Sequence, residues 1–210
     1  MALGVAASIA PANAQDRFRP SDHYNVDCSF FAATTEVDAF EQHTQCGRFD
    51  DTLLVTLDET VTRLLREHFG GREARSWPAC VVLSGAVFGH SYVNYDGLAR
   101  LSRGSIGGPH CNPIDNGVFP TPVGGGKMAY ADVSMKLVHA PGHAYLTPFE
   151  GGYAIACKEK PRFERHPPNI EQRVPIGGKC GLIDTDFSAH GADAMPFEEA
   201  RLRWDTLIKR

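Results

Sequence analysis

The stretch "GGKCGLIDTDF", residues 177–187, decides the fold, because it has the pattern of a short β-strand that ends in a turn. Two glycines precede a run in which larger and smaller apolar side chains alternate, as in a strand with one face on a core. Asp184 ends the run, and an aspartate there turns the chain by hydrogen bonding to its own backbone. We therefore predict a strand over the start of this stretch and a tight turn at Asp184.

The same pattern occurs earlier in the chain, so the stretch is one copy of a repeat. Residues 125–132, "GGKMAYAD", match residues 177–184, "GGKCGLID", and each copy ends in aspartate. A "PFE" segment follows each copy, at 148–150 and at 196–198. A hairpin of this size cannot bury its own apolar face, so a period of about 50 residues implies that neighbouring units stack.

These signals predict a mainly β fold of stacked or packed antiparallel β-hairpin repeats, with at most one or two short helices. We expect repeat units near 80–120, 125–157 and 177–204, within a region 80–210 that forms one continuous domain with residues 15–79.

A helix is expected near residues 58–69, before the β-rich region. In "DETVTRLLREHFGG", Asp58 or Thr60 can cap the helix, apolar residues recur at helical spacing from Val61, and Gly70 supplies a stop. The alternative is a strand interrupted by charges.

Composition places the chain among soluble globular proteins. It has 210 residues, 42% of them hydrophobic, and a net charge of −4 without a Lys/Arg cluster, which argues against a nucleic-acid partner. No segment has the roughly 20 apolar residues of a membrane span. Ala12 and Ala14 flank Asn13 in a cleavage-site pattern, so we expect a signal peptide over residues 1–14 and a periplasmic or secreted protein. A disordered tail of small residues is the alternative.

The six cysteines contain no C-x-x-C pair, which argues against a zinc ribbon or a redox motif. In an oxidising compartment they form three disulfides or, alternatively, include some buried thiols. Sequence leaves several connectivities open, and we predict pairing in chain order: Cys28–Cys46, Cys80–Cys111 and Cys157–Cys180.

The repeated stretches resemble the WG-repeat proteins, whose units carry Gly-Lys-Trp-Gly-aromatic-Ile-Asp and a later Pro-Phe segment. The matching stretches are "GGKMAYADVSMKLV", "TPFEGGYAIAC", "GGKCGLIDTDF" and "MPFEEA", within residues 80–200. The signature Trp-Gly is replaced by Met128-Ala129 and by Cys180-Gly181. The resemblance implies a hairpin frame and provides no catalytic residue.

The motifs that resemble phosphate-binding or metal-binding sites match their patterns only in part. "VGGGKMAY" lacks the first glycine and the hydroxyl of a P-loop, because Thr121 and Met128 stand there. His139 and His143 have zinc-ligand spacing only on a helix, and the Pro141-Gly142 pair between them excludes one. A loop site that recruits His110 or His190 stays open.

Two further patterns concern carboxylates and an interface. Asp184 and Asp186 can form an acid–base pair, although a turn already explains Asp184. Residues 158–166, "KEKPRFERH", are expected to form a long loop because Pro161 and Pro167 exclude regular structure. This loop is either solvated or an interface loop that uses Phe163 and Arg165.

We therefore expect an exported, non-enzymatic binding protein of the WG-repeat type that mediates protein–protein interaction, without cofactor, metal or membrane span. A periplasmic immunity or inhibitor protein against a secreted toxin is the favoured role. The alternatives are an envelope hydrolase or metal-dependent enzyme with His139, His143 and a nearby carboxylate, and a structural envelope component.

Overall fold

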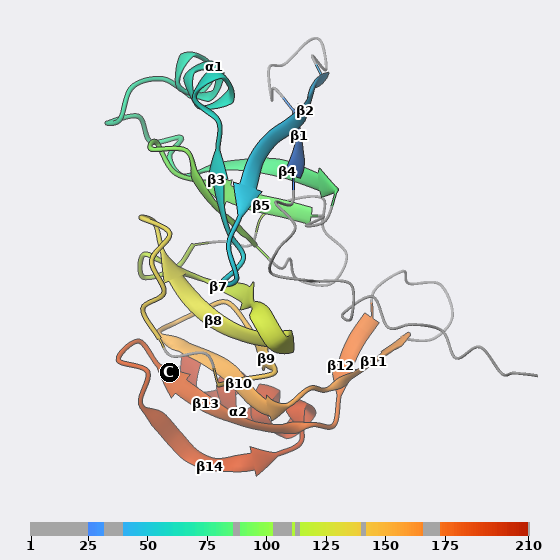
Figure 1. Cartoon of the computed structure of the whole chain (residues 1–210). Helices are drawn as coiled ribbons and strands as arrows, with labels where there is room; N and C mark the ends of the chain where they lie inside the picture. The colour runs from blue at the N-terminus through green and yellow to red at the C-terminus, as the bar shows by residue number, and fades with distance from the viewer. Residues whose placement is uncertain are drawn as a thin grey trace, which may run out of the picture.

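The computed structural model describes residues 25–31, 40–85, 89–102, 111, 114–139, 142–165 and 173–209. The signal peptide predicted over residues 1–14 lies outside these ranges. Within them the chain is mainly β with two α-helices, and all paired strands are antiparallel (Figure 1). The predicted fold class is therefore confirmed. No helix in these ranges is long and apolar enough to cross a membrane.

The N-terminal half is a closed barrel with the strand order β1-β2-β3-β6-β5-β4. Its strands are β1 (Asn25–Phe31), β2 (Phe40–Phe49), β3 (Leu54–Leu57), β4 (Ala79–Gly85), β5 (Gly89–Val93) and β6 (Leu98–Leu101). Closure leaves none of these strands at an open edge. Apolar side chains from alternate positions fill the interior, among them Val26, Val55, Leu83 and Val93.

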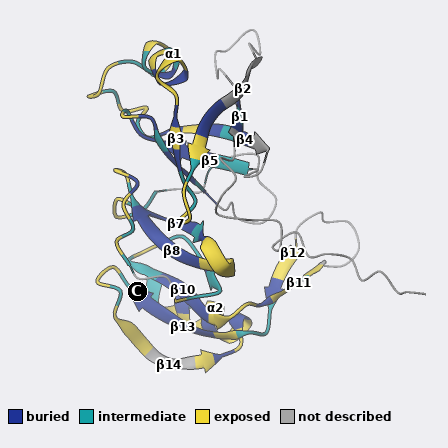
Figure 2. Cartoon of the chain, in the orientation of Figure 1, coloured by how far each residue is buried: buried dark blue, intermediate teal, exposed yellow. Residues whose placement is uncertain are grey.

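The helix α1 (Glu59–Phe69) lies where the sequence predicts a helix and closes one side of the barrel core. Asp58 is the N-cap, and its Oδ1 accepts a hydrogen bond from Val61 N at 2.8 Å. Gly70 ends the helix with φ of 89°, a conformation that favours glycine. Val61 and Leu65 pack into the barrel core, whereas the other face of α1 is exposed (Figure 2).

The C-terminal half consists of three sheets and the helix α2. Its elements are β7 (Val118–Val123), the 3-10 turn η2 (Gly124–Gly126), β8 (Lys127–Asp132), β9 (Tyr145–Leu146), β10 (Tyr153–Glu159), β11 (Arg162–Arg165), β12 (Arg173–Ile176), β13 (Lys179–Asp184), β14 (Ala189–Met195) and α2 (Phe197–Ile208). The main sheet has the order β14-β13-β10-β9, and β7-β8 and β11-β12 form two-stranded sheets.

The main sheet is covered on both faces, which explains its nearly continuous apolar runs. Ile155 and Leu182 pack with Trp204 of α2 in one cluster. Ala154 and Ile183, their neighbours in sequence, belong to a second cluster that contains side chains of β8. Because successive residues of a strand point to opposite faces, β10 and β13 supply both clusters.

The two "PFE" segments have different structures. After the first, Gly151 and Gly152 both have positive φ and form a two-residue turn in which Glu150 N donates to Tyr153 O at 2.9 Å. The second enters α2 at Phe197, because Glu199 and Ala200 follow it in place of glycines. The residues after the shared segment therefore decide between a turn and a helix.

The pairing of the strands expected near 80–120 with the N-terminal strands is not predicted from the sequence. β4 begins at Ala79 and pairs with β1, so the strands of the unit expected near 80–120 complete the barrel with β1, β2 and β3. The reason is long-range pairing, which the local pattern of residues 80–101 does not contain.

The strands β8 and β13 share a burial pattern and end in the same kind of turn, although β8 belongs to a two-stranded sheet and β13 to the main sheet. Both have one exposed residue, four buried residues and a half-buried aspartate, in that order (Figure 2). Asp132 Oδ1 accepts from the backbone N–H groups two and four residues later, at 2.8 and 3.0 Å. Asp184 Oδ1 does the same at 3.0 and 2.9 Å. The third residue after each aspartate, Met135 or Phe187, has positive φ.

The same turn occurs twice in the barrel, where no Gly-Gly-Lys marks it. Asp50 Oδ1 accepts from Thr52 N at 2.8 Å and from Leu54 N at 3.0 Å. Asn94 Oδ1 accepts from Asp96 N at 3.1 Å and from Leu98 N at 2.9 Å. These four turns, at positions 50, 94, 132 and 184, are called the Asx turns below.

The buried side chain of Arg100 joins the two halves of the chain. Its Nε donates to Met135 O at 2.7 Å, and its Nη1 donates to Thr52 O at 2.9 Å. Only 3% of the residue is exposed. Burial lowers the pKa of Arg100, and the nearby Asp50 carboxylate acts in the opposite direction. Arg100 thus connects an Asx turn of the barrel to the Asx turn after β8.

The predicted disulfide pairs Cys28–Cys46, Cys80–Cys111 and Cys157–Cys180 are all present. The first joins β1 to β2 within the barrel. The last joins directly opposed residues of β10 and β13. Three disulfides indicate an oxidising environment, outside the cytosol of an ordinary cell.

We predict that Asp132→Ala lowers the free energy of unfolding by about 1–2 kcal/mol, because two backbone N–H groups lose their acceptor. Asp132→Asn is the matched control: it keeps an oxygen acceptor, as Asn94 does, and is expected to cost under about 0.5 kcal/mol. Chemical denaturation measures both values. Equal losses for the two variants would contradict the assigned role of the oxygen.

We predict that Arg100→Met destabilises the protein by about 2–4 kcal/mol, because the carbonyls of Thr52 and Met135 lose a buried donor. The exposed Arg48→Met serves as control and is expected to change stability by less than about 0.5 kcal/mol. Denaturation in guanidinium chloride tests the difference. Equal effects of the two substitutions would show that Arg100 does not join the halves.

Candidate functional site

The strands β11 and β12 form a two-stranded sheet that pairs with no other described strand. We call these residues, 162–165 and 173–176, the arm. The arm extends from the end of β10 and returns to β13, and Figure 1 shows it at one side of the main sheet. Phe163 and Arg165, the interface residues predicted from sequence, both lie on β11.

The structure corrects the loop predicted over residues 158–166. Residues 158 and 159 belong to β10, and residues 162–165 are β11, while residue 166 lies outside the described ranges. Pro161 falls between the two strands, so its missing N–H interrupts neither of them. Pro175 is tolerated in β12 because each strand of a two-stranded sheet is an edge strand.

The base of the arm is fixed to the body of the protein by aromatic packing. The Phe163 ring packs edge-on against Tyr145, with ring centroids 5.7 Å apart. Tyr145 in turn packs edge-on against Phe197 of α2 at 5.8 Å. Pro175, directly opposite Phe163, is buried. Phe163 is therefore half-buried and holds β11 against the body, and its predicted role in an interface stays a prediction.

The charged positions of the arm lie on both of its faces, with Arg162 and Glu164 opposite the face of Phe163 and Arg173 on the same face as Phe163. Arg162 and Glu164 alternate with Phe163 and are exposed, and Arg173 on β12 is also exposed. Within the described residues, neither Arg162 nor Arg173 takes part in an ion pair. The strand register places residue 173 directly opposite Arg165. The exposed apolar side chain Val174, 37% accessible, lies beside Arg173 in the chain.

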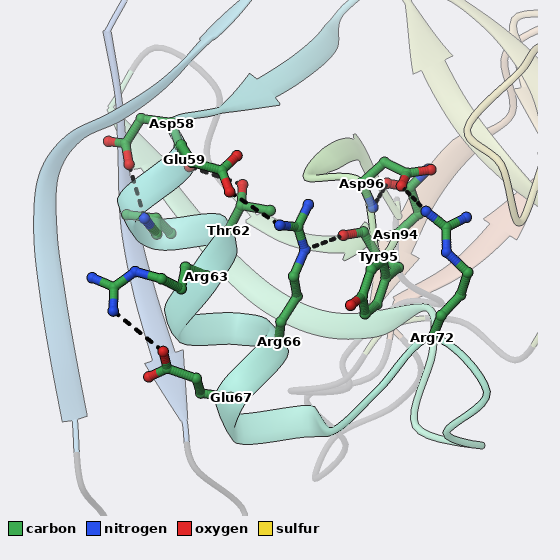
Figure 3. A network of polar contacts seen from close by, with 11 residues as sticks. Asp58, Glu59, Thr62, Arg63, Arg66, Glu67, Arg72, Asn94, Tyr95 and Asp96 are labelled. Atoms are coloured by element: carbon green, nitrogen blue, oxygen red, sulfur yellow. Dashed lines mark hydrogen bonds and ion pairs between the residues drawn. The ribbon is translucent and has the colours of Figure 1, made fainter.

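A second group of arginines surrounds Tyr95 near α1, but its charges are compensated (Figure 3). The guanidinium groups of Arg66 and Arg72 lie over the Tyr95 ring, 4.9 and 4.8 Å from its centroid. Arg66 pairs with Glu59 at 3.0 Å, and Arg72 pairs with Asp96. This group attaches α1 to the Asn94 turn. The sequence offers no signal for it, because its residues come from separate segments.

The two histidines of the alternative enzyme lie close together without a metal-ligand set. The rings of His139 and His143 stack with centroids 5.7 Å apart, and Phe187 stacks on His139 at 4.8 Å. No three His, Cys, Asp or Glu side chains among the described residues are placed to hold a metal ion. His190 is paired with Asp184 at 2.6 Å, and His110 lies outside the described residues.

The environment of His143 disfavours its charged form. Burial lowers the pKa of His143, and the positive groups of His139, Lys158 and Lys127 lower it further. Nδ1 of His143 is buried and makes no hydrogen bond within the described structure. His143 is thus half-buried, in contrast to the solvated turn residue that the sequence favours.

Asp184 serves the turn, the structural role predicted for it from sequence. A hydrogen bond from His190 and backbone hydrogen bonds from Ser188 and Asp186 lower the pKa of Asp184. A carboxylate held in its ionised form does not donate a proton near neutral pH. Met128 stands where a P-loop has its Ser or Thr hydroxyl, and its side chain is buried in β8.

We predict that the stability of the protein falls as the pH drops below about 6.5, the usual pKa of histidine. The folded state holds the pKa of His143 below this value, so the unfolded state binds the proton first on acidification. His143→Gln removes this titration and is expected to reduce the loss of stability between neutral and mildly acidic pH. Chemical denaturation across this pH range, with His68→Gln as exposed control, measures the effect. Identical pH profiles of wild type and His143→Gln would contradict it.

Comparisons of this chain with models of protein families, with curated proteins and with solved structures find no match. Inferences about its function therefore rest on the geometry of its own residues.

Proposed function

We propose that the protein is exported and acts by binding another protein, without catalysing a reaction. The observation that carries this proposal is the arm, a small sheet whose exposed Arg162 and Arg173 make no ion pair with any described residue, on a base fixed by aromatic packing. Arginine is enriched in protein interfaces, and preorganisation lowers the entropy lost on binding. Three disulfides support an extracellular or periplasmic location.

Within this class we propose the role of a periplasmic immunity or inhibitor protein against a secreted toxin. A small disulfide-linked β scaffold suits such a role, since its fold persists where reducing systems and chaperones are scarce. The equivalent burial of β8 and β13 supports a relation to the WG-repeat proteins. Their hairpins supply the frame, and the arm between β10 and β13 is an addition to it.

The structure suggests a sharp variant for testing this function. Glu159 of β10 and Lys179 of β13 are directly opposed, so an Asn-Gly pair in place of residues 160–178 closes a two-residue hairpin without the arm. Cys157–Cys180 remains outside the deletion and reports on correct folding. Trypsin resistance and circular dichroism verify that the armless protein is folded.

We predict that the tagged wild-type protein retains one protein at a fixed ratio from a periplasmic extract of its own source, and that the armless protein loses it. Tyr95→Ala is the matched control, because the compensated arginines around Tyr95 are not assigned to binding; it should retain the partner. Native purification with quantitative mass spectrometry measures the ratio. The absence of any partner at a fixed ratio with wild type would contradict the proposed function.

A further inference from the structure

The arm contains three arginines, Arg162, Arg165 and Arg173, and one glutamate, Glu164, in a chain whose net charge is −4. Elsewhere in the part of the chain that the structure describes, five arginines pair with carboxylates, namely Arg63, Arg66, Arg72, Arg201 and Arg203, whereas the exposed Arg48 and Arg75 do not. Within the described residues, Arg162 and Arg173 make no such pair. The arm therefore differs from the arginine group around Tyr95, in which Arg66 and Arg72 are both paired with carboxylates.

The register of the arm adds a second observation. Arg165 and Arg173 occupy directly opposed positions of an antiparallel pair. Like charges at opposed positions destabilise a strand pair, and the two strands have no further strand to support them. A hairpin selected for stability alone would gain from an acidic residue at either position. The arrangement fits an arm whose positive charge is neutralised by a ligand from outside.

We infer that the arm binds an acidic segment of the partner protein. Arg162 and Arg173 lie on opposite faces of the arm, so each pairs with a carboxylate of that segment where the segment passes around the edge of the arm. The exposed Val174, on the face of Arg162, receives an apolar side chain. Arginine pairs with carboxylates through a planar fork of donors, which gives these contacts geometric specificity. This inference rests on the proposed function and names the chemistry of the partner at the same site.

The fixed base of the arm supports a recognition role. Phe163, Tyr145 and Phe197 form a chain of ring contacts that holds β11 against the body. Phe197 N also donates to Gly177 O at 2.9 Å, and Glu198 accepts from Gly177 N at 2.9 Å. The N-terminal end of α2 is thus tied to the point where β12 leaves the arm. A partner segment then meets arginines whose backbone is already ordered, which reduces the entropy cost of binding.

A short fluorescein-labelled peptide of alternating glutamate and valine tests the inference on the full chain by fluorescence anisotropy. We expect wild type to bind it, more weakly at higher salt, and the double variant Arg162→Glu with Arg173→Glu to bind at least about tenfold more weakly. The matched control, Arg75→Glu with Lys136→Glu, changes the net charge equally on exposed residues outside the arm and should bind as wild type does. A peptide of alternating lysine and valine should not bind.

The inference is overturned if wild type does not bind the acidic peptide, or if the control variant loses binding as the arm variant does. It is also overturned if heparin, single-stranded DNA or anionic vesicles bind more tightly through the same two arginines, since the arm then serves another class of ligand. Capture of a partner by wild type is measured separately. If wild type captures a partner but does not bind the acidic peptide, the inference of an acidic segment is rejected, and the proposed protein-binding function is not.

The single variant Arg173→Glu separates recognition from structure. It places a carboxylate at the position opposite Arg165, so we expect an unchanged or raised Tm together with weakened peptide binding. A lowered Tm with unchanged peptide binding would assign Arg173 to the fold and reject its role in recognition.

Discussion

The Asx turn is the interaction on which the rest of the structure depends. In each copy one side-chain oxygen accepts two backbone N–H groups, so a single residue fixes the path of the chain between two strands. The third residue after it has positive φ and is glycine at only one of the four turns, Gly97. The hydrogen bonds and the surrounding packing therefore hold Leu53, Met135 and Phe187 in a conformation that such residues adopt rarely.

The turns also connect units, because a closed turn presents backbone carbonyls to its neighbour. Arg100 uses two such carbonyls as acceptors, and the Asn94 side chain donates to Ser134 O at 3.3 Å. The barrel and the C-terminal sheets thus meet through the turns themselves. Around these contacts lies a shared apolar cluster that includes Tyr92 from the barrel and Phe119 from β7. The polar contacts set the register of the two halves, and the apolar cluster supplies the driving force.

Features that depend on neighbouring residues could be predicted from the sequence. The strand-to-turn pattern of residues 179–184, helix α1 and the three disulfides between successive cysteines are of this kind. The closed barrel could not be predicted, because β1 pairs with β4 and the local pattern of either segment does not indicate its distant partner. The Asx turn at Asp50 is not predicted, since no Gly-Gly-Lys precedes it. A loop is predicted in place of β11 because Pro161 and Pro167 obscure the alternation of Arg162, Phe163 and Glu164.

The contrast between the two arginine groups shows why net charge is a poor guide to the partner of this chain. At physiological ionic strength, charges are screened over about 8 Å, so a partner segment at the arm responds to the groups beside it and hardly to the charge of the whole molecule. Around Tyr95, Glu59 and Asp96 already neutralise the arginines, and another anion would have to displace them. On the arm no described carboxylate must be displaced from Arg162 or Arg173. The same residue type therefore stabilises the fold at one place and is free to meet a carboxylate from outside at the other.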